Sequence, residues 1–170
     1  KILSLEEIRA EMGDCRRCKL YGGRTRLVFG DGDPNARLMF VGEAPGADDD
    51  KQGVPFVGAA GQLLNNLLSK LGLRREEVYI ANILKSRPPG NRDPEADEIA
   101  ACMPFLEKQI KAIRPRVIVT LGRFSMGRFL PNAKISEVHG RSFQIKGRLV
   151  VPMFHPAAAL HQPSLKPSVE

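Results

Sequence analysis

Residues 38–71 read LMFVGEAPGADDDKQGVPFVGAAGQLLNNLLSKL, and this stretch decides the fold. Its first four residues are apolar and stop at Gly42, a pattern that predicts a short buried strand. Leucines then recur with the spacing of one helical face, at Leu63, Leu64, Leu67, Leu68 and Leu71. The stretch therefore predicts a strand followed by a helix, the repeating unit of a parallel sheet.

The same alternation continues along the chain. A second strand is predicted from Val78 to Ala81, followed by a helix that Asp93 and Pro94 open and that runs to about Ile113. A third strand is predicted from Val117 to Leu121. Strands separated by helices in this way predict a mainly parallel sheet covered by helices.

The two ends of the chain have other patterns. Ser4 and Glu7 have the spacing of a capping box, so we expect a helix there that ends at Gly13. Residues 142–145 and 149–153 flank a Lys-Gly-Arg turn and predict a hairpin. A chain of 170 residues suits one core. We therefore expect residues 1–170 to form a single α/β domain, with helices on both faces of a mainly parallel central sheet.

The charge balance favours a polyanionic partner. There are 26 Lys and Arg residues against 19 Asp and Glu, a formal net charge of +7. A solvated basic surface would give the same count, so phosphate binding gains support only from positive residues near a pocket. Six such residues stand in predicted loops or hairpins: Lys85, Arg87, Arg92, Arg141, Lys146 and Arg148. Nucleic acid is the partner that the composition favours.

Two classes of protein are disfavoured. No stretch approaches the roughly 18 consecutive apolar residues that a membrane helix needs, and residues 1–12 lack the apolar block of a secretory signal. We expect a monomer in the cytoplasm with no membrane partner. Cys15 and Cys18, separated by two residues in CRRC, indicate metal binding or redox chemistry in a reducing compartment.

The candidate site lies where the strands end, because open α/β sheets bind ligands at the carboxyl ends of their strands. The residues that follow the predicted strands are Gly42 and Glu43, then Asn82, Gly122 and His155. A carboxylate, an amide, a glycine turn and an imidazole would then share one crevice.

The loop over residues 42–61 holds five glycines and two prolines, too many for a helix, and is predicted to approach a ligand closely. Phe56 within it could stack on a planar base, with a core phenylalanine as the alternative. The run Asp48-Asp49-Asp50 could hold Mg²⁺, but we expect it to be a solvated segment.

Three segments in order resemble family 4 of the uracil-DNA glycosylases, the iron-sulfur type. They are VGEAPGADDDKQGVPFVGAAGQLL (residues 41–64), YIANILKSRPPGNRDP (residues 79–94) and MFHPAAALHQP (residues 153–163). The resemblance extends from CRRC to HQP, nearly the whole chain. It implies a uracil-DNA glycosylase-like fold and a monofunctional enzyme of base excision repair, acting on DNA near the nucleoid.

The resemblance also implies roles for individual residues. Asn82 would read uracil, because its amide can donate to O4 and accept from N3–H, a pattern that cytosine cannot match. Phe56 would stack on the flipped base, with backbone contacts near Gly42. His155 would donate to O2 as negative charge develops there, and Glu43 would position the attacking water.

Contacts with the rest of the DNA are expected from two segments. Leu160 would be the side chain that fills the gap left by the flipped base, with His161 near a phosphate. Arg87 and Arg92 are alternative phosphate contacts, although either could be an ordinary surface charge.

The cysteines depart from the pattern of the family. The resemblance implies a [4Fe-4S] cluster on four cysteines; Cys15, Cys18 and Cys102 match, but Ser86 stands at the remaining position. Three thiolates with the Ser86 oxygen or another fourth ligand would give a labile cluster, because oxygen is a poor ligand for it. Zinc, or no metal at all, is the alternative.

Two other functions remain open from the sequence. The first is a protein that binds or traps uracil-DNA without turnover, and the second is a metal-bearing subdomain that docks on a polymerase or another protein.

Overall fold

The structure is a computed structural model that describes residues 3–156 of the chain. Within these residues one sheet has the strand order β1-β3-β2-β4-β6-β5. Its strands are β1 (Asp31–Gly32), β2 (Leu38–Gly42), β3 (Tyr79–Asn82), β4 (Val117–Leu121), β5 (Phe143–Ile145) and β6 (Arg148–Met153). The helices are α1 (Leu5–Met12), α2 (Ala47–Gln52), α3 (Ala59–Lys70), α4 (Ala96–Ile113), α5 (Arg123–Phe129) and α6 (Ile135–Val138). Short 3-10 turns are η1 (Lys19–Gly22), η2 (Arg75–Glu77) and η3 (Pro89–Asn91).

The pairing of the strands confirms a mainly parallel sheet. β3, β2, β4 and β6 run parallel to one another, while β1 and β5 are antiparallel to their neighbours at the two edges. β5 pairs with β6 through Phe143 opposite Val150, which confirms the predicted hairpin. The four parallel strands therefore end at one edge of the sheet, where α/β proteins bind their ligands.

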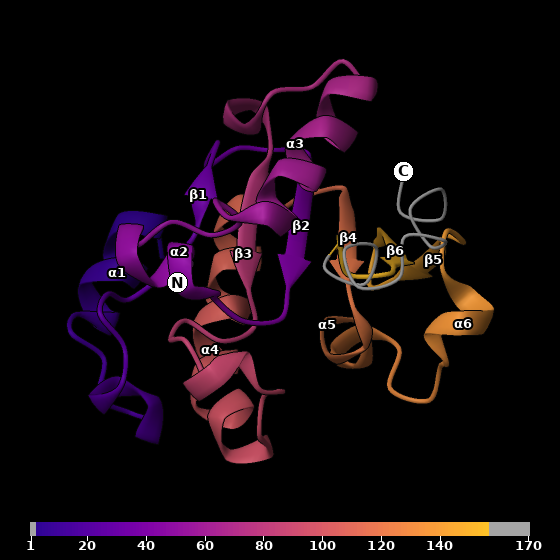
Figure 1. Ribbon diagram of the computed structural model, residues 1–170. Helices are drawn as coiled ribbons and strands as arrows, with labels where there is room; N and C mark the ends of the chain where they lie inside the picture. The colour runs from indigo at the N-terminus through magenta and orange to yellow at the C-terminus, as the bar shows by residue number, and fades with distance from the viewer. Residues whose placement is uncertain (1–2, 157–170) are drawn as a thin grey trace.

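Helices cover both faces of the sheet, as predicted, with α3 and α4 on opposite faces (Figure 1). Successive side chains of a strand point to opposite faces. In β2, Met39 and Val41 pack in one cluster with Leu106 of α4, whereas Phe40 between them packs in another cluster with Leu64 of α3. The core is thus two apolar layers separated by the sheet.

The first helix forms as its capping box predicts. The backbone N–H of Glu7 donates to the Ser4 hydroxyl (3.2 Å) and the Ser4 N–H donates to the Glu7 carboxylate (3.1 Å). The helix ends at Met12, followed by Gly13 with φ of 53°. α1 lies on the outer side of α4, where Ile8 and Phe105 share a buried cluster.

Two predicted boundaries are shifted. α4 begins at Ala96 rather than at Pro94, because the Glu98 carboxylate accepts the backbone N–H of Glu95 (3.0 Å) and makes that residue the N-cap. The second predicted strand lies one residue later than expected, since pairing with Gly42 extends it through Asn82. Asn82 is therefore the last residue of β3.

The expectation that residues 42–61 hold too many glycines for a helix is wrong. The stretch contains α2, and α3 begins within it at Ala59. Most of its glycines stand at helix ends: Gly46 and Gly58 are N-caps and Gly53 is a C-cap with φ of 74°. Glycine count alone misled because glycine is common at the ends of helices as well as in loops.

Among residues 3–156, no helix is both long enough and apolar enough to cross a membrane.

Candidate active site

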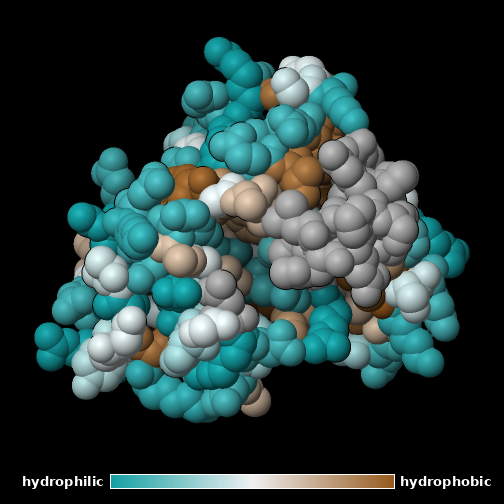
Figure 2. Space-filling view, viewed as in Figure 1, coloured by the Kyte–Doolittle hydropathy of each residue, from teal (hydrophilic) through white to brown (hydrophobic). Residues whose placement is uncertain are grey.

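The carboxyl ends of the parallel strands open onto a cavity of ≈ 530 Å³, a size typical of a small-molecule site. The cavity is surrounded by the turn after β2, the starts of α2 and α3, the loop before α4 and His155, two residues beyond the end of β6. It is lined by residues 43–49, 58–61 and 92–94, together with Phe56, Pro88 and His155. The surface seen from the side of Figure 1 is largely hydrophilic, with hydrophobic residues in small patches (Figure 2).

Asn82 brings an amide with unused hydrogen-bonding capacity to this edge. Its side chain is 1% exposed, and within the described residues neither its Oδ1 nor its Nδ2 has a hydrogen-bond partner. A Cβ atom on Gly42 would lie 2.4 Å from Asn82 Oδ1 and 2.6 Å from the Phe56 ring. Gly42 therefore lets the amide and the ring come together, and any larger residue would separate them.

Phe56 is a core residue, as one of the two alternatives from the sequence has it, and it also lines the cavity; its stacking on a base stays a prediction. Its φ is 55°, a left-handed backbone conformation that is costly for a bulky residue. Asp49 holds this conformation, because its carboxylate accepts the N–H groups of Phe56 (3.1 Å) and Val57 (3.0 Å).

The acidic run is not a solvated segment, and that expectation is corrected. Asp49 and Asp50 are buried, 8% and 4% exposed. Asp50 accepts the N–H of Thr25 (2.8 Å), so the run ties α2 to the chain before β1 while Asp49 holds the wall of the cavity. The sequence could not show which of the three consecutive aspartates are buried, because the residues are identical and no apolar pattern surrounds them.

His155 lies against Phe56, with ring centroids 5.5 Å apart in a stacked arrangement. Burial lowers the pKa of His155 to about 4, although the charge of Asp49 opposes this shift. The imidazole is therefore neutral at ordinary pH, and it can donate one ring N–H to a ligand in the cavity without charging the site.

Glu43 lines the other side of the cavity and is held in place. Its Oε2 accepts the backbone N–H of Phe124 (3.0 Å), and a Cβ on Gly122 would lie 2.5 Å from that oxygen. Burial raises the pKa of Glu43; the Phe124 N–H opposes the shift, the charge of Asp93 adds to it and that of Arg123 opposes it. The other carboxylate oxygen can still accept a proton, or a hydrogen bond from a water molecule.

Lys85 lies beneath the site instead of in it. It is completely buried and does not line the cavity, and its Nζ donates to the backbone oxygen of Asn82 (2.9 Å) and to Gln109 Oε1 (2.7 Å). Burial lowers the pKa of Lys85 to about 7. An amine so placed cannot form a Schiff base with a sugar in the cavity, and it braces the strand end that carries Asn82.

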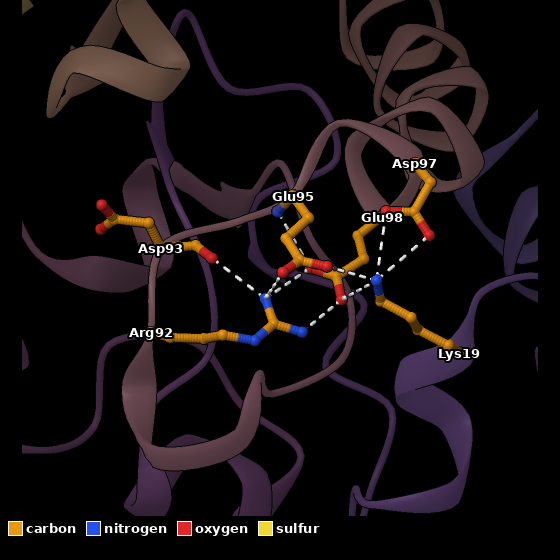
Figure 3. Close-up of polar contacts among 6 residues, drawn as sticks. All are labelled: Lys19, Arg92, Asp93, Glu95, Asp97 and Glu98. Carbon is orange, nitrogen blue, oxygen red and sulfur yellow. Dashed lines mark hydrogen bonds and ion pairs between the residues drawn. The ribbon is translucent and has the colours of Figure 1, made fainter.

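Arg92 lines the cavity, and its guanidinium forms an ion pair with Glu98, a fully buried carboxylate at the start of α4 (Figure 3). Arg92 Nη1 donates to Glu98 Oε1 (2.9 Å) and Nη2 to Oε2 (2.6 Å), a two-pronged ion pair. Lys19, in the segment after Cys18, pairs with Glu95 and lies 3.9 Å from Glu98. The cluster joins the N-terminal segment, α4 and the cavity loop.

Of the other positive residues expected near the pocket, one lies next to the cavity lining and three do not. Arg87 directly precedes Pro88, which lines the cavity, whereas Arg141 does not line it. Lys146 and Arg148 form the turn at the amino end of β6, the opposite edge of the sheet, so that expectation is wrong for these two. Leu160 and His161 lie outside the described residues.

The three cysteines gather around α4. Cys18 packs against the cluster that contains Cys102, and Cys15 shares a cluster with Phe105 on the same helix. Burial raises the pKa of Cys102 to about 11, with the nearby charges of Cys18 and Cys15 adding to the shift. Within residues 3–156, no three acidic, histidine or cysteine side chains are arranged as a metal site.

Ser86, at the fourth expected position, directly follows Lys85, whose backbone N–H bonds to Cys102. The Ser86 hydroxyl accepts from Arg24 Nη1 (2.9 Å), while Arg17 Nη1 donates to Cys15 Sγ (3.3 Å). Guanidinium groups beside two members of the set would stabilise negatively charged ligands there. Three thiols and one hydroxyl are thus the donor types present around α4, but in the described residues they are not arranged as a metal site.

Sequence reasoning missed Asp49, Glu98 and Lys19, which hold the walls of the site. The one available signal was the position of Glu98 three residues after Glu95, where capping carboxylates stand.

Comparisons with known proteins agree with this geometry. The model of the uracil DNA glycosylase superfamily matches residues 29–169. A type-4 uracil-DNA glycosylase of Sulfurisphaera tokodaii is 49% identical, over 98% of this chain and 80% of that protein. Type-4 uracil-DNA glycosylases of Archaeoglobus fulgidus and Thermotoga maritima are 46% and 44% identical, over 98% and 94% of this chain and 88% and 85% of theirs. Sheet, cavity and sequence thus agree, and the chain belongs to the uracil DNA glycosylase superfamily and, within it, to the type-4 branch.

Proposed function

We propose that this protein excises uracil from DNA by hydrolysing the N-glycosidic bond, which leaves an abasic site for base excision repair. The observation that carries the proposal is the buried Asn82 amide, whose donor and acceptor are both unused within the described residues. Leaving both unpaired costs free energy that a base with an adjacent N–H and carbonyl would recover. Uracil offers that edge at N3 and O4, whereas cytosine does not.

The base reaches the cavity only if its nucleotide leaves the helix, at a cost of a few kcal/mol that a U·G mismatch reduces. Phe56, held by Asp49, supplies a fixed ring face on which the base stacks. Leu160 is our candidate for the residue that fills the gap, with His161, Arg87 and Arg92 at the phosphates; the pairing with Glu98 gives Arg92 a positioning role as well.

Bond cleavage places negative charge on the base and positive charge on the sugar. Neutral His155 donates an N–H to O2 of the departing uracil, which lowers the barrier by a few kcal/mol. The Glu43 carboxylate orients a water toward the sugar carbon and offsets its positive charge. Water attacks that carbon as the bond to nitrogen breaks. We expect no strand cleavage, because no lysine among the described residues lines the cavity to form a Schiff base with the sugar.

For the cysteine centre we propose a [4Fe-4S] cluster held by Cys15, Cys18 and Cys102, with Ser86 as the fourth ligand; zinc is the alternative. The support is the gathering of soft donors around α4 and the guanidinium groups beside them. The cluster would supply a cross-link between the N-terminal segment and α4 and need not touch the DNA chemistry.

We also propose that residues 1–170 form one domain that acts as a monomer on uracil-containing DNA, without a membrane partner. Because DNA is the substrate, we place the protein in the cytoplasm at the nucleoid of a prokaryotic cell; the relatives named above come from archaea and bacteria.

The test is excision from a labelled duplex with one uracil opposite guanine, followed by alkali, with thymine and cytosine duplexes as controls. Cleavage at uracil alone is expected. Glu43→Gln should reduce the excision rate by about 100-fold or more while DNA binding stays within about twofold. Binding without base release in the metal-loaded wild type would instead support a protein that traps uracil-DNA.

A further inference from the structure

Three arginines form a row across the sheet at the edge opposite the cavity. β2 pairs with β4 through Leu38 opposite Val117, and β4 pairs with β6 through Val117 opposite Leu149. One residue earlier, this register aligns Arg37, Arg116 and Arg148, which we call the arginine row. Backbone hydrogen bonds fix the alignment, from Arg116 N to Arg37 O (2.9 Å) and from Leu149 N to Arg116 O (3.0 Å).

The three side chains leave the sheet on one face. Arg37 and Arg116 stand two residues before Met39 and Ile118, which both pack on the face covered by α4. Arg148 stands two residues before Val150, which is paired with Ile118. Residues two apart in a strand share a face, so all three arginines lie on the same face. Because they stand side by side on neighbouring strands, adjacent members of the row are about one strand spacing apart, ~4.8 Å.

Within the described residues no carboxylate forms an ion pair with this row, although the same register places Glu77, which pairs with Arg74, beside Arg37. Arg37 and Arg116 are exposed, and none of the three makes an ion pair with a carboxylate of residues 3–156. Arg148 Nε is buried and has no hydrogen-bond partner there. Lys111 and Arg114 add two more positive charges at the end of α4, whose C-terminal dipole offsets only about half a charge.

Like charges side by side in a sheet destabilise it, so the row fits a bound polyanion better than open solvent. All three residues are arginine, whose planar guanidinium matches phosphate with two parallel hydrogen bonds. The row spans roughly 10 Å, and a duplex carries one phosphate per about 1.7 Å of its axis over both strands, so phosphates lie within reach of all three flexible side chains.

We propose that the arginine row is a second DNA-binding surface, which holds the backbone of a duplex other than the one whose base enters the cavity. The strands between the two edges are five or six residues long, so the row lies about 16 Å or more from the cavity on the opposite edge. One straight stretch of duplex cannot reach both edges. The protein therefore bridges two DNA segments. This inference rests on the proposed function only in taking DNA as the polyanion.

The experiment compares two triple variants that lose the same charge. The row variant is Arg37→Gln, Arg116→Gln and Arg148→Gln. The control is Lys108→Gln, Arg128→Gln and Lys134→Gln, three cations that do not belong to the row and do not line the cavity. Protein on an immobilised duplex without uracil is offered a second, fluorescent duplex without uracil. Wild type and control are expected to capture the second duplex, and the row variant to capture at least about tenfold less. Equal capture by both variants, or none by wild type, would overturn the proposal.

Further readouts separate the row from the active site and from the fold. Excision from a single short duplex should be unchanged within about twofold in the row variant. Failure of excision in wild type and both variants would count against the proposed function and would leave the bridging proposal intact. A plot of the logarithm of the binding constant for the second duplex against the logarithm of the salt concentration should be less steep in the row variant than in wild type. The slope should differ by about 2.7, at ~0.9 for each of three lost phosphate contacts. The melting temperature should stay equal or rise, because repulsion is removed; a fall would indicate a structural role and overturn the proposal.

An acidic protein segment is the competing occupant. A polyglutamate peptide that displaces the second duplex at lower charge concentration than a single-stranded oligonucleotide does would overturn the assignment to DNA. Displacement by the oligonucleotide first supports it.

Discussion

At the scale of single residues, Glu43 determines how the proposed reaction depends on pH. Its burial raises the pKa of the carboxyl, against the Phe124 N–H and Arg123 and with the charge of Asp93. Only the ionised form can orient water, so kcat/KM should rise with pH through a midpoint above the ordinary value of 4.5. His155, with its pKa near 4, is already neutral over that range and adds no second step.

A pH profile of single-turnover excision checks this prediction. The Phe124 N–H belongs to the backbone, so no side-chain substitution removes it. Arg123→Gln instead removes a positive charge that lowers the pKa of Glu43, and it should shift the midpoint further upward. A midpoint below that of a free glutamate in both proteins would contradict the account.

Asp49 gives a second prediction at this scale. Its carboxylate accepts the N–H groups of Phe56 and Val57 and that of Gly46 (3.3 Å). Asp49→Asn turns an acceptor into an NH₂ group facing N–H donors, so we expect a loss of roughly 2–3 kcal/mol in unfolding free energy. Because the ring of Phe56 loses its fixed position, KM for uracil-DNA should rise more than kcat falls.

Chemical denaturation and steady-state kinetics measure the two effects separately. Asp50→Asn is the matched control, since that residue is equally buried but holds Thr25 and not the cavity wall. The control should lose stability and keep its KM; an equal rise in KM would show that Asp49 acts only through the fold.

At the scale of elements, the ion cluster of Figure 3 joins the start of α4 to the loop that lines the cavity. The Arg92 hydrogen bond lowers the pKa of Glu98 below its usual value. A depressed carboxyl pKa stabilises the fold above the unfolded value near 4.5, and this contribution is lost as pH falls through the folded value. Glu98→Gln should therefore lower stability by about 2 kcal/mol at pH 7 and by less at pH 3.

Thermal melts of wild type and Glu98→Gln at the two pH values test this sign. A double-mutant cycle with Arg92→Gln isolates the pair, and a coupling below about 0.5 kcal/mol would contradict it. Lys19 is exposed, and its loss should cost much less.

The elements also show which structural signals a sequence carries. The strand from Leu38 and the hairpin after Ser142 were predicted because apolar runs and turn residues determine them locally. α2 was missed because its six residues carry no apolar face, and burial of Asp49 and Asp50 is decided by tertiary hydrogen bonds. Partners such as Arg92 and Glu98 are determined by packing that no local pattern records.

At the scale of the whole molecule, a metal at the cysteine centre would add a cross-link between the N-terminal segment and α4, which apolar packing and the ion pairs of Lys19 already join. Chelation should lower the melting temperature and raise amide exchange in residues 3–24 and at the start of α4, leaving β2 and β4 protected. Ser86→Cys should increase bound iron and slow its loss to the chelator, because sulfur is the better ligand.

Iron content, zinc content and exchange by mass spectrometry are the measurements. Iron retention equal to wild type in Ser86→Cys would remove residue 86 from the ligand set. Zinc without iron in both proteins would favour the alternative metal.

The whole-molecule arrangement explains why the meeting of the strand ends at one edge could be predicted but the arginine row could not. Gly42, Asn82 and His155 stand at strand ends, so topology alone brought them to one edge. Arg37, Arg116 and Arg148 are far apart in sequence, and only the register of three strands aligns them. Register is a property of the folded sheet and not of any segment.

The unpaired Asn82 amide has a consequence for turnover. In the proposed reaction, cutting the glycosidic bond changes the sugar but leaves the N3 and O4 edge of the base intact, so the amide should bind the detached base as well as the attached one. We therefore expect free uracil to inhibit competitively, and we expect release of the base and of the abasic strand to limit the turnover rate.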